Sequence, residues 1–517
     1  MSPLPEVLRR IPMLASEWRA GAAGDAAAAL LGALLVLAFA PYGVYPLAVL
    51  APTGLLWLIA SVSPRRAAWR GFLFGAAEFA CGVHWIYISL HDMGGLESAL
   101  AVLMLAALVA IMALYSAAAC TLSVRYAPAG GGLRTLVLFP AAWTLLEWVR
   151  GWFLTGFPWL SLGYSQADGP LRGYASLVGV YGVGFCVLLT SGLLQETLAR
   201  GRYLRRRLAL LAVLVGLWLA GAMLAGLRWT HAAGPDLSVS LIQGDVPQDQ
   251  KWEPEAFIPT LKLYRDLTDA HWQSRLIIWP EAAVPAYQDE VQLTYLDPLE
   301  ADARKHGTDI LLGVPTYDPV SDYYFNSVIS LGSSDGTYDK RHLVPFGENF
   351  EFLPHWVKSI LRDLDLPYSS FTPGAADQPL LKAAGYPIGT SICYEDAFGN
   401  EIMRALPQAA FLVNVSNDGW FGNSIALPQH LEIARMRAIE TGRYLLRATN
   451  TGITAIIDDG GRVLARAPME KVSVLDGTLK PLAGATPVTR WGDVPAVALS
   501  FLLLLGCAWR NRKRNAG

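Results

Sequence analysis

Three residues of reactive types lie at or near the ends of apolar runs in the second half of the chain. Glu281 follows the run 276–280, Cys393 follows 388–392, and Lys340 lies in the segment 338–348. A thiol has a pKa of about 8.5 and needs a neighbouring base before it can attack a carbonyl at neutral pH. Glu281 can act as that base. Lys340 can hold the thiolate and then the oxyanion, so the set predicts nucleophilic catalysis by Cys393.

The surroundings of Cys393 offer further help, although each residue alone is weak as a sign of catalysis. The N–H of Tyr394 could be a second oxyanion donor. A helix beginning just after Cys393, with Glu395 and Asp396 in its first turn, would direct its positive end at the sulfur. An isolated cysteine is usually a small buried hydrophobic residue, so the hypothesis depends on the three residues together.

The elements that must position these residues are short strands alternating with helices. Apolar β-rich runs predict strands at 237–242, 276–279, 310–314, 327–331, 388–392 and 411–415. Helical stretches are expected at 397–406 and 431–444, and the segment 456–463 predicts a hairpin that turns at an Asp-Gly pair. This alternation predicts a layered α/β domain.

The first half of the chain has a different composition. Hydrophobic residues make up 53% of the 517 residues and charged residues 16%, and mean hydropathy is +0.33. Every lysine lies after residue 250. These values exclude an ordinary soluble protein, and the net charge of −2 gives no basis for nucleic-acid binding. The pattern predicts membrane spans near 25–41, 45–62, 71–90, 97–123, 136–157, 171–193, 207–227 and 492–509.

The arginines predict how these spans are oriented. They gather before the first span, in alternate connections and after the last span, at residues 9, 10 and 19, 65 and 66, 125 and 134, 200–207, and 510–514. By the positive-inside rule both termini are cytoplasmic, and the segment from about 230 to 485 lies outside. A cleaved signal peptide is the competing interpretation of the first span, but Pro41 would follow the candidate site at 38–40. About eight spans are expected, with seven as the alternative.

The predicted architecture is therefore a polytopic α-helical membrane domain followed by an extracytoplasmic α/β domain. The expected boundaries are 1–235 for the membrane domain, 236–483 for the catalytic domain, and 484–517 for a last span with a basic tail. Among the five cysteines only Cys393 lies in the catalytic domain, so no disulfide can form within that domain. The eight histidines form no convincing ligand cluster, so neither a metal nor a cofactor is expected.

Two further features have alternative interpretations. In the stretch 350–364, apolar residues that include Phe352, Trp356 and Ile360 recur at helical spacing. A helix packed on its own domain is one interpretation, and an amphipathic lid at the membrane surface is the favoured one. Within the predicted spans, Glu78, His84 and Glu147 are ionisable, with Arg150 near a span's outer end. Arg150 could meet a phospholipid phosphate, but pairing with Glu147 three residues earlier is favoured.

Three segments of the catalytic domain resemble the signature segments of the nitrilase, or carbon-nitrogen hydrolase, superfamily. They are Trp279-Pro280-Glu281, the segment 339–348 that contains Lys340, and Cys393-Tyr394-Glu395. The whole chain is similar to the apolipoprotein N-acyltransferase family, through segments 147–152 and 156–160, Gly244, Gln248, Lys251-Trp252 and 417–421. The resemblance implies a four-layer αββα sandwich with a Glu-Lys-Cys triad.

The resemblance also implies a reaction and its partners. Cys393 would take an acyl chain from a phospholipid as a thioester and pass it to the α-amine of a diacylglyceryl-cysteine at the N-terminus of an apolipoprotein. Glu281 would be the general base and Lys340 the oxyanion stabiliser. The implied supporting residues are Glu348, Tyr394, Glu395, Trp252 and Asn326. Trp420 and Phe421 join Phe352, Trp356 and Ile360 as candidates for a lid or a membrane-facing surface.

The implied location is the bacterial inner membrane, with the catalytic domain facing the periplasm. Two other functions compete with acyl transfer. A membrane-anchored amidase of the nitrilase superfamily, acting on a small soluble substrate, would need only one span rather than about eight. A transporter or binding scaffold with a decayed enzyme domain conflicts with the intact set of Glu281, Lys340 and Cys393.

Overall fold

The computed structural model describes residues 21–127, 132–199, 203–345, 347–348 and 371–516. These residues form two compact units. The helical unit comprises the chain up to His84, Val102–Gly226 and Asp493 onward, and the catalytic unit comprises Trp85–Ala101 and Leu227–Gly492. The predicted lid residues lie outside the described residues; they are Phe352, Trp356 and Ile360.

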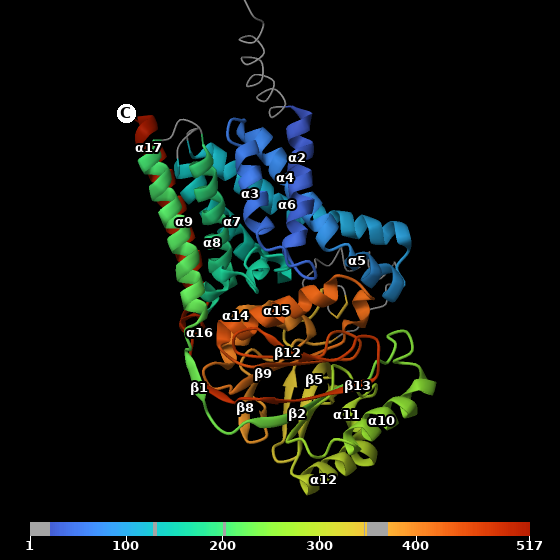
Figure 1. The fold of residues 1–517 in the computed structure, drawn as a ribbon. Helices are drawn as coiled ribbons and strands as arrows, with labels where there is room; N and C mark the ends of the chain where they lie inside the picture. The colour runs from blue at the N-terminus through green and yellow to red at the C-terminus, as the bar shows by residue number, and fades with distance from the viewer. Residues whose placement is uncertain (1–20, 128–131, 200–202, 346, 349–370, 517) are drawn as a thin grey trace, which may run out of the picture. The chain divides into compact units, whose positions relative to one another are not determined.

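The helical unit is built mainly from apolar α-helices (Figure 1). Its main helices are α2 (Ala22–Leu35), α3 (Leu47–Leu58), α4 (Pro64–Gly82), α6 (Ser98–Arg125), α7 (Phe139–Arg150), α8 (Ala175–Leu198), α9 (Leu204–Ala225) and α17 (Val494–Ala516). Ser63 caps α4 by accepting from the Arg66 N–H at 3.3 Å, and Pro64 occupies its first position.

Among the described residues, three helices are long and apolar enough to cross a membrane by themselves. They are Ser98–Arg125, Pro170–Leu198 and Leu204–Ala225. Pro64–Gly82 qualifies only together with Trp85–Met93, after a break at residues 83 and 84. The apolar helices Ala22–Ala38, Leu47–Leu58 and Val494–Arg510 are shorter. The helical membrane character is thus present, and the count of about eight spans stays a prediction.

The predicted span 136–157 shows why composition overestimates helix length. Helix α7 ends at Arg150, and the chain continues through Gly151 into a short turn at Phe153–Thr155, where Leu154 has φ of +53°. A Cβ at Gly156 would lie 2.3 Å from the carbonyl oxygen of Gly151, so this position requires glycine. The apolar run therefore continues beyond the helix as irregular structure.

The catalytic unit contains two six-stranded sheets, each with a parallel centre and antiparallel edges. The order in the first sheet is β13-β2-β3-β4-β5-β6, and in the second it is β12-β11-β10-β9-β8-β7. Strands β2, β3 and β4 are mutually parallel, as are β8, β9 and β10. Buried parallel strands need apolar residues on both faces, which explains why these strands are the apolar runs of the sequence.

The strands of the first sheet are β2 (Leu237–Gln243), β3 (Leu276–Ile278), β4 (Asp309–Asp318), β5 (Tyr323–Leu331), β6 (Gly336–Asp339) and β13 (Ser473–Leu479). Those of the second are β7 (Lys382–Ala383), β8 (Tyr386–Ile392), β9 (Phe411–Ser416), β10 (Leu445–Thr449), β11 (Ala455–Ile457) and β12 (Val463–Arg466). A small separate sheet pairs β1 (Thr230–Ala232) with β14 (Leu482–Gly484).

Helices cover the outer face of each sheet and complete four layers (Figure 1). Helices α10 (Pro254–Asp269) and α12 (Asp297–His306) pack on the first sheet through Leu261, Tyr264 and Leu299. Helix α15 (Ala426–Thr441) packs on the second sheet through Leu431 and Ala434, among others. Shorter helical segments are α5 (Trp85–Tyr87), α11 (Gln288–Val291), α14 (Gly399–Ile402) and α16 (Pro487–Trp491). The predicted αββα layering is confirmed.

Two local predictions have different outcomes. The hairpin at the Asp-Gly pair is confirmed, because β11 and β12 are antiparallel and Asp458 accepts from the N–H groups of Gly460 and Arg462 at 3.0 and 2.8 Å. The helix expected just after Cys393, and the helical stretch expected at 397–406, are present only as short helical pieces. A single 3₁₀ turn, Cys393–Ala397, is followed by α14 and another 3₁₀ turn, Met403–Ala405. These pieces are too short to align the peptide dipoles of a helix toward the sulfur.

Candidate active site

The three residues singled out for chemistry all follow strands of the catalytic unit. Glu281 follows β3 and Lys340 follows β6 in the first sheet, whereas Cys393 follows β8 in the second. Residues that follow strand ends project from a rigid edge. The site therefore draws its acid and its cation from one sheet and its thiol from the other.

Glu281, Lys340, Glu348 and Asn326 form one buried polar network. The Lys340 ammonium lies 3.3 Å from Glu281 Oε1 and 2.8 Å from Glu348 Oε2. Asn326 Nδ2 donates to Glu281 Oε1 at 2.7 Å and to Glu348 Oε1 at 3.0 Å. Burial lowers the pKa of Lys340, but the charges of Glu281 and Glu348 outweigh it and raise the pKa above its ordinary value. The lysine is therefore a permanent cation.

The other oxygen of Glu281 and the backbone around it are also fixed. The Asn417 N–H donates to Glu281 Oε2 at 2.9 Å, and Lys251 Nζ donates to the main-chain carbonyl of Glu281 at 3.1 Å. Burial lowers the pKa of Lys251 to about 8, against the attraction of Glu281. A Cβ at Gly313 of β4 would lie 2.7 Å from the Glu281 Cα, so the strand needs glycine to pass this close.

Cys393 lies where the charges of Glu281 and Lys340 both act on its thiol. Burial, followed by the charge of Glu281, raises the pKa of the Cys393 thiol well above its ordinary value, and Lys340 opposes them. The resting sulfur is therefore a thiol that must lose its proton during reaction. Cys393 has φ of +53°, in the left-handed region that a residue with a side chain rarely adopts. Surrounding contacts must maintain this conformation.

Glu395 fixes the turn that carries Cys393. Its carboxylate accepts from the N–H groups of Arg341, His342 and Ile392 at 2.7, 3.1 and 2.7 Å, and from the Tyr338 hydroxyl at 3.1 Å. Burial raises the pKa of Glu395 to about 7 even though these N–H groups favour the ionised form. Because the donors lie in or just after β6 and at the end of β8, Glu395 joins the segment of Lys340 to that of Cys393.

The remaining predicted site residues lie around this core. Tyr394 is buried, with its ring 5.0 Å from that of Phe398. Trp252 and Trp420 are exposed, whereas the Phe421 ring packs 4.8 Å from that of Trp85 in an edge-to-face arrangement. Ser89 also donates to the main-chain carbonyl of Trp420 at 2.8 Å. The segment Trp85–Ala101 thus covers the turn that holds these aromatic residues.

One group of residues behind Cys393 was not predicted from the sequence. This group, here called the Asp-His-Arg cluster, is fully or almost fully buried, and its members bond to one another. It consists of Asp396, Asp418, His430 and Arg447. Their positions in the sequence are scattered, so spacing alone could not assemble them. The available signal was the presence of a histidine and an arginine inside segments whose other residues are mostly apolar.

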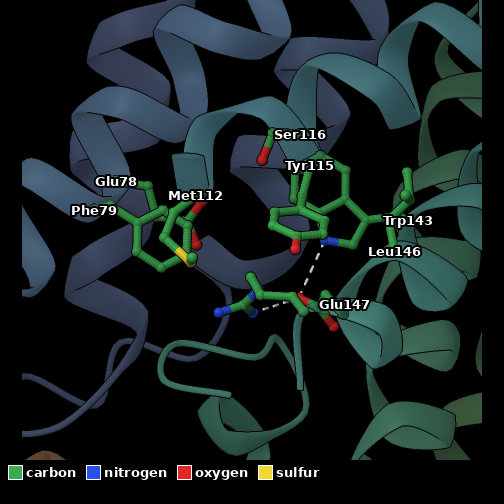
Figure 2. A pocket seen from close by; sticks show the side chains of 9 residues that line it. Glu78, Phe79, Met112, Tyr115, Ser116, Trp143, Leu146 and Glu147 are labelled. Carbon is green, nitrogen blue, oxygen red and sulfur yellow. Dashed lines mark hydrogen bonds and ion pairs between the residues drawn. The ribbon is translucent and has the colours of Figure 1, made fainter. Parts of the chain in front are cut away.

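The helical unit has a buried charged group of its own, seen in Figure 2. Arg150 donates to the carbonyls of Phe157 and Trp159 at 2.9 and 2.5 Å and lies 3.9 Å from Glu147 Oε1. Glu147 Oε1 also accepts from Trp143 Nε1 at 3.1 Å. The favoured interpretation, pairing of Arg150 with Glu147, matches this geometry. Glu78 faces the same small cavity, which Met112 and Tyr115 also line.

Within the described parts of the chain, no group of three or more His, Cys, Asp or Glu side chains could hold a metal ion. The catalytic unit instead brings a buried carboxylate, a permanent ammonium ion and a thiol together. This set can deprotonate a nucleophile and stabilise an oxyanion without another group.

The four layers and this site are the features of a carbon-nitrogen hydrolase domain, and the carbon-nitrogen hydrolase model matches residues 238–487. The model of the apolipoprotein N-acyltransferase N-terminal domain matches residues 31–193. An apolipoprotein N-acyltransferase from Methylococcus capsulatus is 49% identical over 94% of this chain and 95% of that protein. One from Nitrosomonas europaea is 44% identical over 93% and 96%. The chain belongs to the apolipoprotein N-acyltransferase family.

Among solved structures, a nitrilase-superfamily member from Saccharomyces cerevisiae is similar over 48% of this chain and 93% of that chain. Its sequence identity is 19% and its TM-score 0.36.

Proposed function

We propose that this enzyme moves a fatty acyl chain from a membrane phospholipid to the N-terminal amine of the diacylglyceryl-cysteine of apolipoproteins, through a thioester on Cys393. The observation that carries the proposal is the buried contact of Glu281 with Lys340 beside the Cys393 thiol, in a chain related over nearly its whole length to apolipoprotein N-acyltransferases. Glu281, Lys340 and Cys393 are the proposed catalytic residues.

In the first step Glu281 takes the thiol proton and Cys393 Sγ attacks the ester carbonyl carbon of the phospholipid. Because burial keeps the resting thiol protonated, proton removal must accompany attack. The Lys340 ammonium and a backbone N–H such as that of Tyr394 stabilise the oxyanion. A C–S bond forms, the C–O bond to glycerol breaks, and the proton passes from Glu281 to the leaving alkoxide as the lysophospholipid departs.

In the second step the α-amine of the lipoprotein attacks the thioester carbonyl carbon. A C–N bond forms and the C–S bond breaks, while Glu281 accepts a proton from the amine and returns it to the sulfur. Lys340 faces the same oxyanion again. Its contacts with both Glu281 and Glu348 keep its ammonium group in one place during both steps.

The supporting residues act through their hydrogen bonds to this set. Asn326 and Glu348 hold Glu281 and Lys340, and Glu395 holds the turn of Cys393. Tyr394 supplies the oxyanion N–H, and Trp252, Trp420 and Phe421 lie at the substrate side. The stretch that contains Phe352, Trp356 and Ile360 is the proposed lid, which excludes water from the acyl-enzyme.

The proposed setting is the bacterial inner membrane, with the catalytic domain in the periplasm and both termini in the cytoplasm. About eight spans are proposed, with membrane domain 1–235, catalytic domain 236–483 and a final span and tail at 484–517. The arginines of alternate connections support this orientation. A topology reporter after Arg207 should read cytoplasmic and one near Gly234 periplasmic. Both on one side would contradict the topology.

Intact-mass measurement tests the thioester. The purified enzyme, mixed with phospholipid and no amine acceptor, should gain the mass of one acyl chain, and Cys393→Ala should gain none. Cys81→Ala is the matched control, because Cys81 is an exposed thiol of the helical unit and should leave the adduct unchanged. An adduct that survives Cys393→Ala would remove Cys393 from its proposed role.

The fate of the adduct separates the transferase from the amidase or hydrolase alternative. A diacylated lipopeptide with a free α-amine should discharge the acyl-enzyme rapidly, and the same peptide with an acetylated amine should not. Release of free fatty acid that is unaffected by the lipopeptide would identify a hydrolase instead.

A further inference from the structure

The Asp-His-Arg cluster lies directly behind the nucleophile and is built from four different elements. Asp396 belongs to the turn Cys393–Ala397, Asp418 to the turn Asp418–Phe421, His430 to α15 and Arg447 to β10. Each of the four side chains is at most 1% exposed. None of them takes part in the two chemical steps described above.

Hydrogen-bond chemistry assigns one proton of His430, and the charges around the ring bear on the other. Its Nε2 lies 2.9 Å from Asp396 Oδ1 and 3.2 Å from the main-chain carbonyl oxygen of Cys393. A carbonyl oxygen and a carboxylate can only accept, so Nε2 must carry hydrogen. Its Nδ1 lies 3.0 Å from Asp418 Oδ1, which can only accept, and 2.8 Å from Arg447 Nη2, which can only donate, so hydrogen bonding alone does not assign a proton to Nδ1. Because two buried carboxylates flank the ring and one guanidinium offsets only one of them, the balance of charge favours a proton on Nδ1 and thus an imidazolium.

Arg447 completes the cluster, and its positive charge disfavours a second positive charge on His430. Its Nη1 lies 3.1 Å from Asp396 Oδ2 and its Nη2 2.9 Å from Asp418 Oδ2, while Nη2 is also 2.8 Å from His430 Nδ1. Two carboxylates beside one guanidinium leave a formal charge of −1, which a charged His430 brings to zero. Burial and Arg447 lower the pKa of His430, but Asp396 and Asp418 outweigh them and raise it to about 9.

The same residues support the backbone of Cys393. Its carbonyl oxygen accepts from His430 Nε2 and from Asn414 Nδ2, each at 3.2 Å. The residue has positive φ, so its turn needs contacts that hold it. The charge of Asp418 also raises the pKa of the Cys393 thiol, so the cluster acts on the sulfur electrically as well.

We propose that His430 is a positioning residue for the nucleophile: as an imidazolium it holds the Cys393 carbonyl and cancels the remaining negative charge of the cluster behind the sulfur. This inference rests on the proposed role of Cys393. The thiolate then faces Glu281 and Lys340 in front and a neutral cluster of Asp396, Asp418, Arg447 and His430 behind. Loss of the charge on His430 leaves −1 behind the sulfur and makes the thiolate harder to form.

The rate of Cys393 alkylation by iodoacetamide as a function of pH tests the proposal. The full-length enzyme in detergent micelles is used, and mass spectrometry follows the peptide that contains Cys393. His430→Gln keeps an N–H donor but cannot carry charge, so its profile should move up by about one pH unit, a roughly tenfold loss of rate below the midpoint. The double variant His430→Gln/Asp418→Asn restores a charge of zero, and its profile should return toward that of the wild type.

Thr441→Val is the matched control. Thr441 is a buried residue of the same helix whose hydroxyl donates to the helix carbonyl of Arg437 at 2.8 Å and lies outside the Asp-His-Arg cluster, so the profile of this variant should not move. An unchanged profile in His430→Gln, or a shift that the double variant does not reverse, overturns the proposal. If His430→Gln does not fold, the double variant alone tests the proposal, because it buries no unpaired charge. An upward shift of the alkylation profile in the double variant would then overturn the proposal.

The same preparations separate this inference from the proposed function. Each is also mixed with vesicles of equal parts phosphatidylethanolamine and phosphatidylglycerol. A wild-type enzyme that gains no acyl mass counts against Cys393 as the acyl carrier. If the wild-type enzyme gains the acyl mass but the alkylation profile of His430→Gln is not shifted, the result counts against the proposed role of His430 and not against that of Cys393.

Discussion

The two units differ in how completely their buried charged side chains are paired and hydrogen-bonded. In the Asp-His-Arg cluster of the catalytic unit, Asp396 and Asp418 each bond to both His430 and Arg447, and with the proposed charge on His430 the formal charges sum to zero. In the helical unit, two acids, Glu78 and Glu147, accompany the single Arg150, and one oxygen of each acid has no hydrogen-bond partner among the described residues. All four carboxylate oxygens of the first group are bonded, although Arg447 Nε has no partner among the described residues, whereas the acids of the second group are not saturated.

The difference follows from the secondary structure around each group. A helix uses its backbone N–H groups internally, so a side chain between helices finds few free donors. Glu147 finds one at Leu162, at 3.1 Å, only because the chain there is irregular. Strand ends and tight turns leave N–H groups free, and Glu395 collects three of them. Turn-rich structure is thus the better support for a buried charge.

The largest effect is expected from breaking the saturated cluster. Arg447→Leu removes the guanidinium between Asp396 and Asp418 and leaves buried carboxylates short of a partner. The free energy of unfolding should fall by about 3–5 kcal/mol, measured by denaturant or thermal unfolding in detergent. Arg462→Leu is the control: Arg462 pairs with Asp458 at the surface, and its loss should cost about 1 kcal/mol or less. Similar losses for both would contradict the comparison.

The second effect is a pH dependence of stability. The pKa of His430 is raised from 6.5 to about 9 in the folded state, so its contribution is fully present below pH 6.5 and is lost as pH rises through 9. Over this window the contribution of His430 to stability, taken as the difference between the wild type and His430→Gln, should fall by an amount on the order of 3 kcal/mol. Thermal unfolding at pH 6.5, 7.5 and 9 measures it. His430→Gln should lack most of this slope, and an equal slope in both proteins would refute the assignment.

A smaller loss is expected at Glu395. Glu395→Gln keeps the shape of the side chain but turns an amide NH₂ toward N–H donors, so at least one of Arg341, His342 and Ile392 loses its acceptor. The expected destabilisation is about 1–3 kcal/mol. The midpoint of unfolding gives the stability, and the rate of acyl-enzyme formation should also fall because the turn of Cys393 loosens. An unchanged acylation rate would show that Glu395 does not position the nucleophile.

The smallest change is expected at Glu78. Glu78→Gln changes a side chain whose Oε2 has no hydrogen-bond partner among the described residues, so its effect on the free energy of unfolding should stay below about 1 kcal/mol. Glu147→Gln is the informative partner, because Glu147 Oε1 accepts from Trp143 and from the Leu162 N–H. If Glu78→Gln cost as much as Glu147→Gln, the view of the helical group as unsaturated would be wrong.

Much of the catalytic unit could be predicted because its central strands are buried on both faces. Runs such as 237–242, 388–392 and 411–415 are rich in apolar and β-branched residues, and each lies within a strand. Two edge strands, β7 and β13, escaped prediction. β7 has two residues, and β13 is only partly buried, so neither has an apolar run. Strand β10 was missed because Arg447 interrupts it, a residue that the interior accepts only with Asp396 and Asp418 beside it.

The site could be predicted to a similar degree. Glu281, Lys340 and Cys393 each follow a strand end and belong to recognisable segments, so their types and contexts singled them out. His430 and Asp418 could not be found this way, because their significance depends on contacts between segments that are distant in sequence. Hydropathy likewise gave no sign that Trp85–Ala101 groups with the catalytic unit, since it continues an apolar helix.

That grouping has a consequence for biogenesis. Trp85 Nε1 donates to Gln429 Oε1 at 3.2 Å, and its ring covers Phe421, yet the ribosome makes Trp85 long before either partner. The early segment must wait, uncovered, until the sheets have emerged and folded onto it. A fragment that begins at Leu227 would lack this piece and expose the aromatic surface that it covers. Secretion of the catalytic unit as a free-standing protein would therefore require Trp85–Ala101 to be supplied from outside.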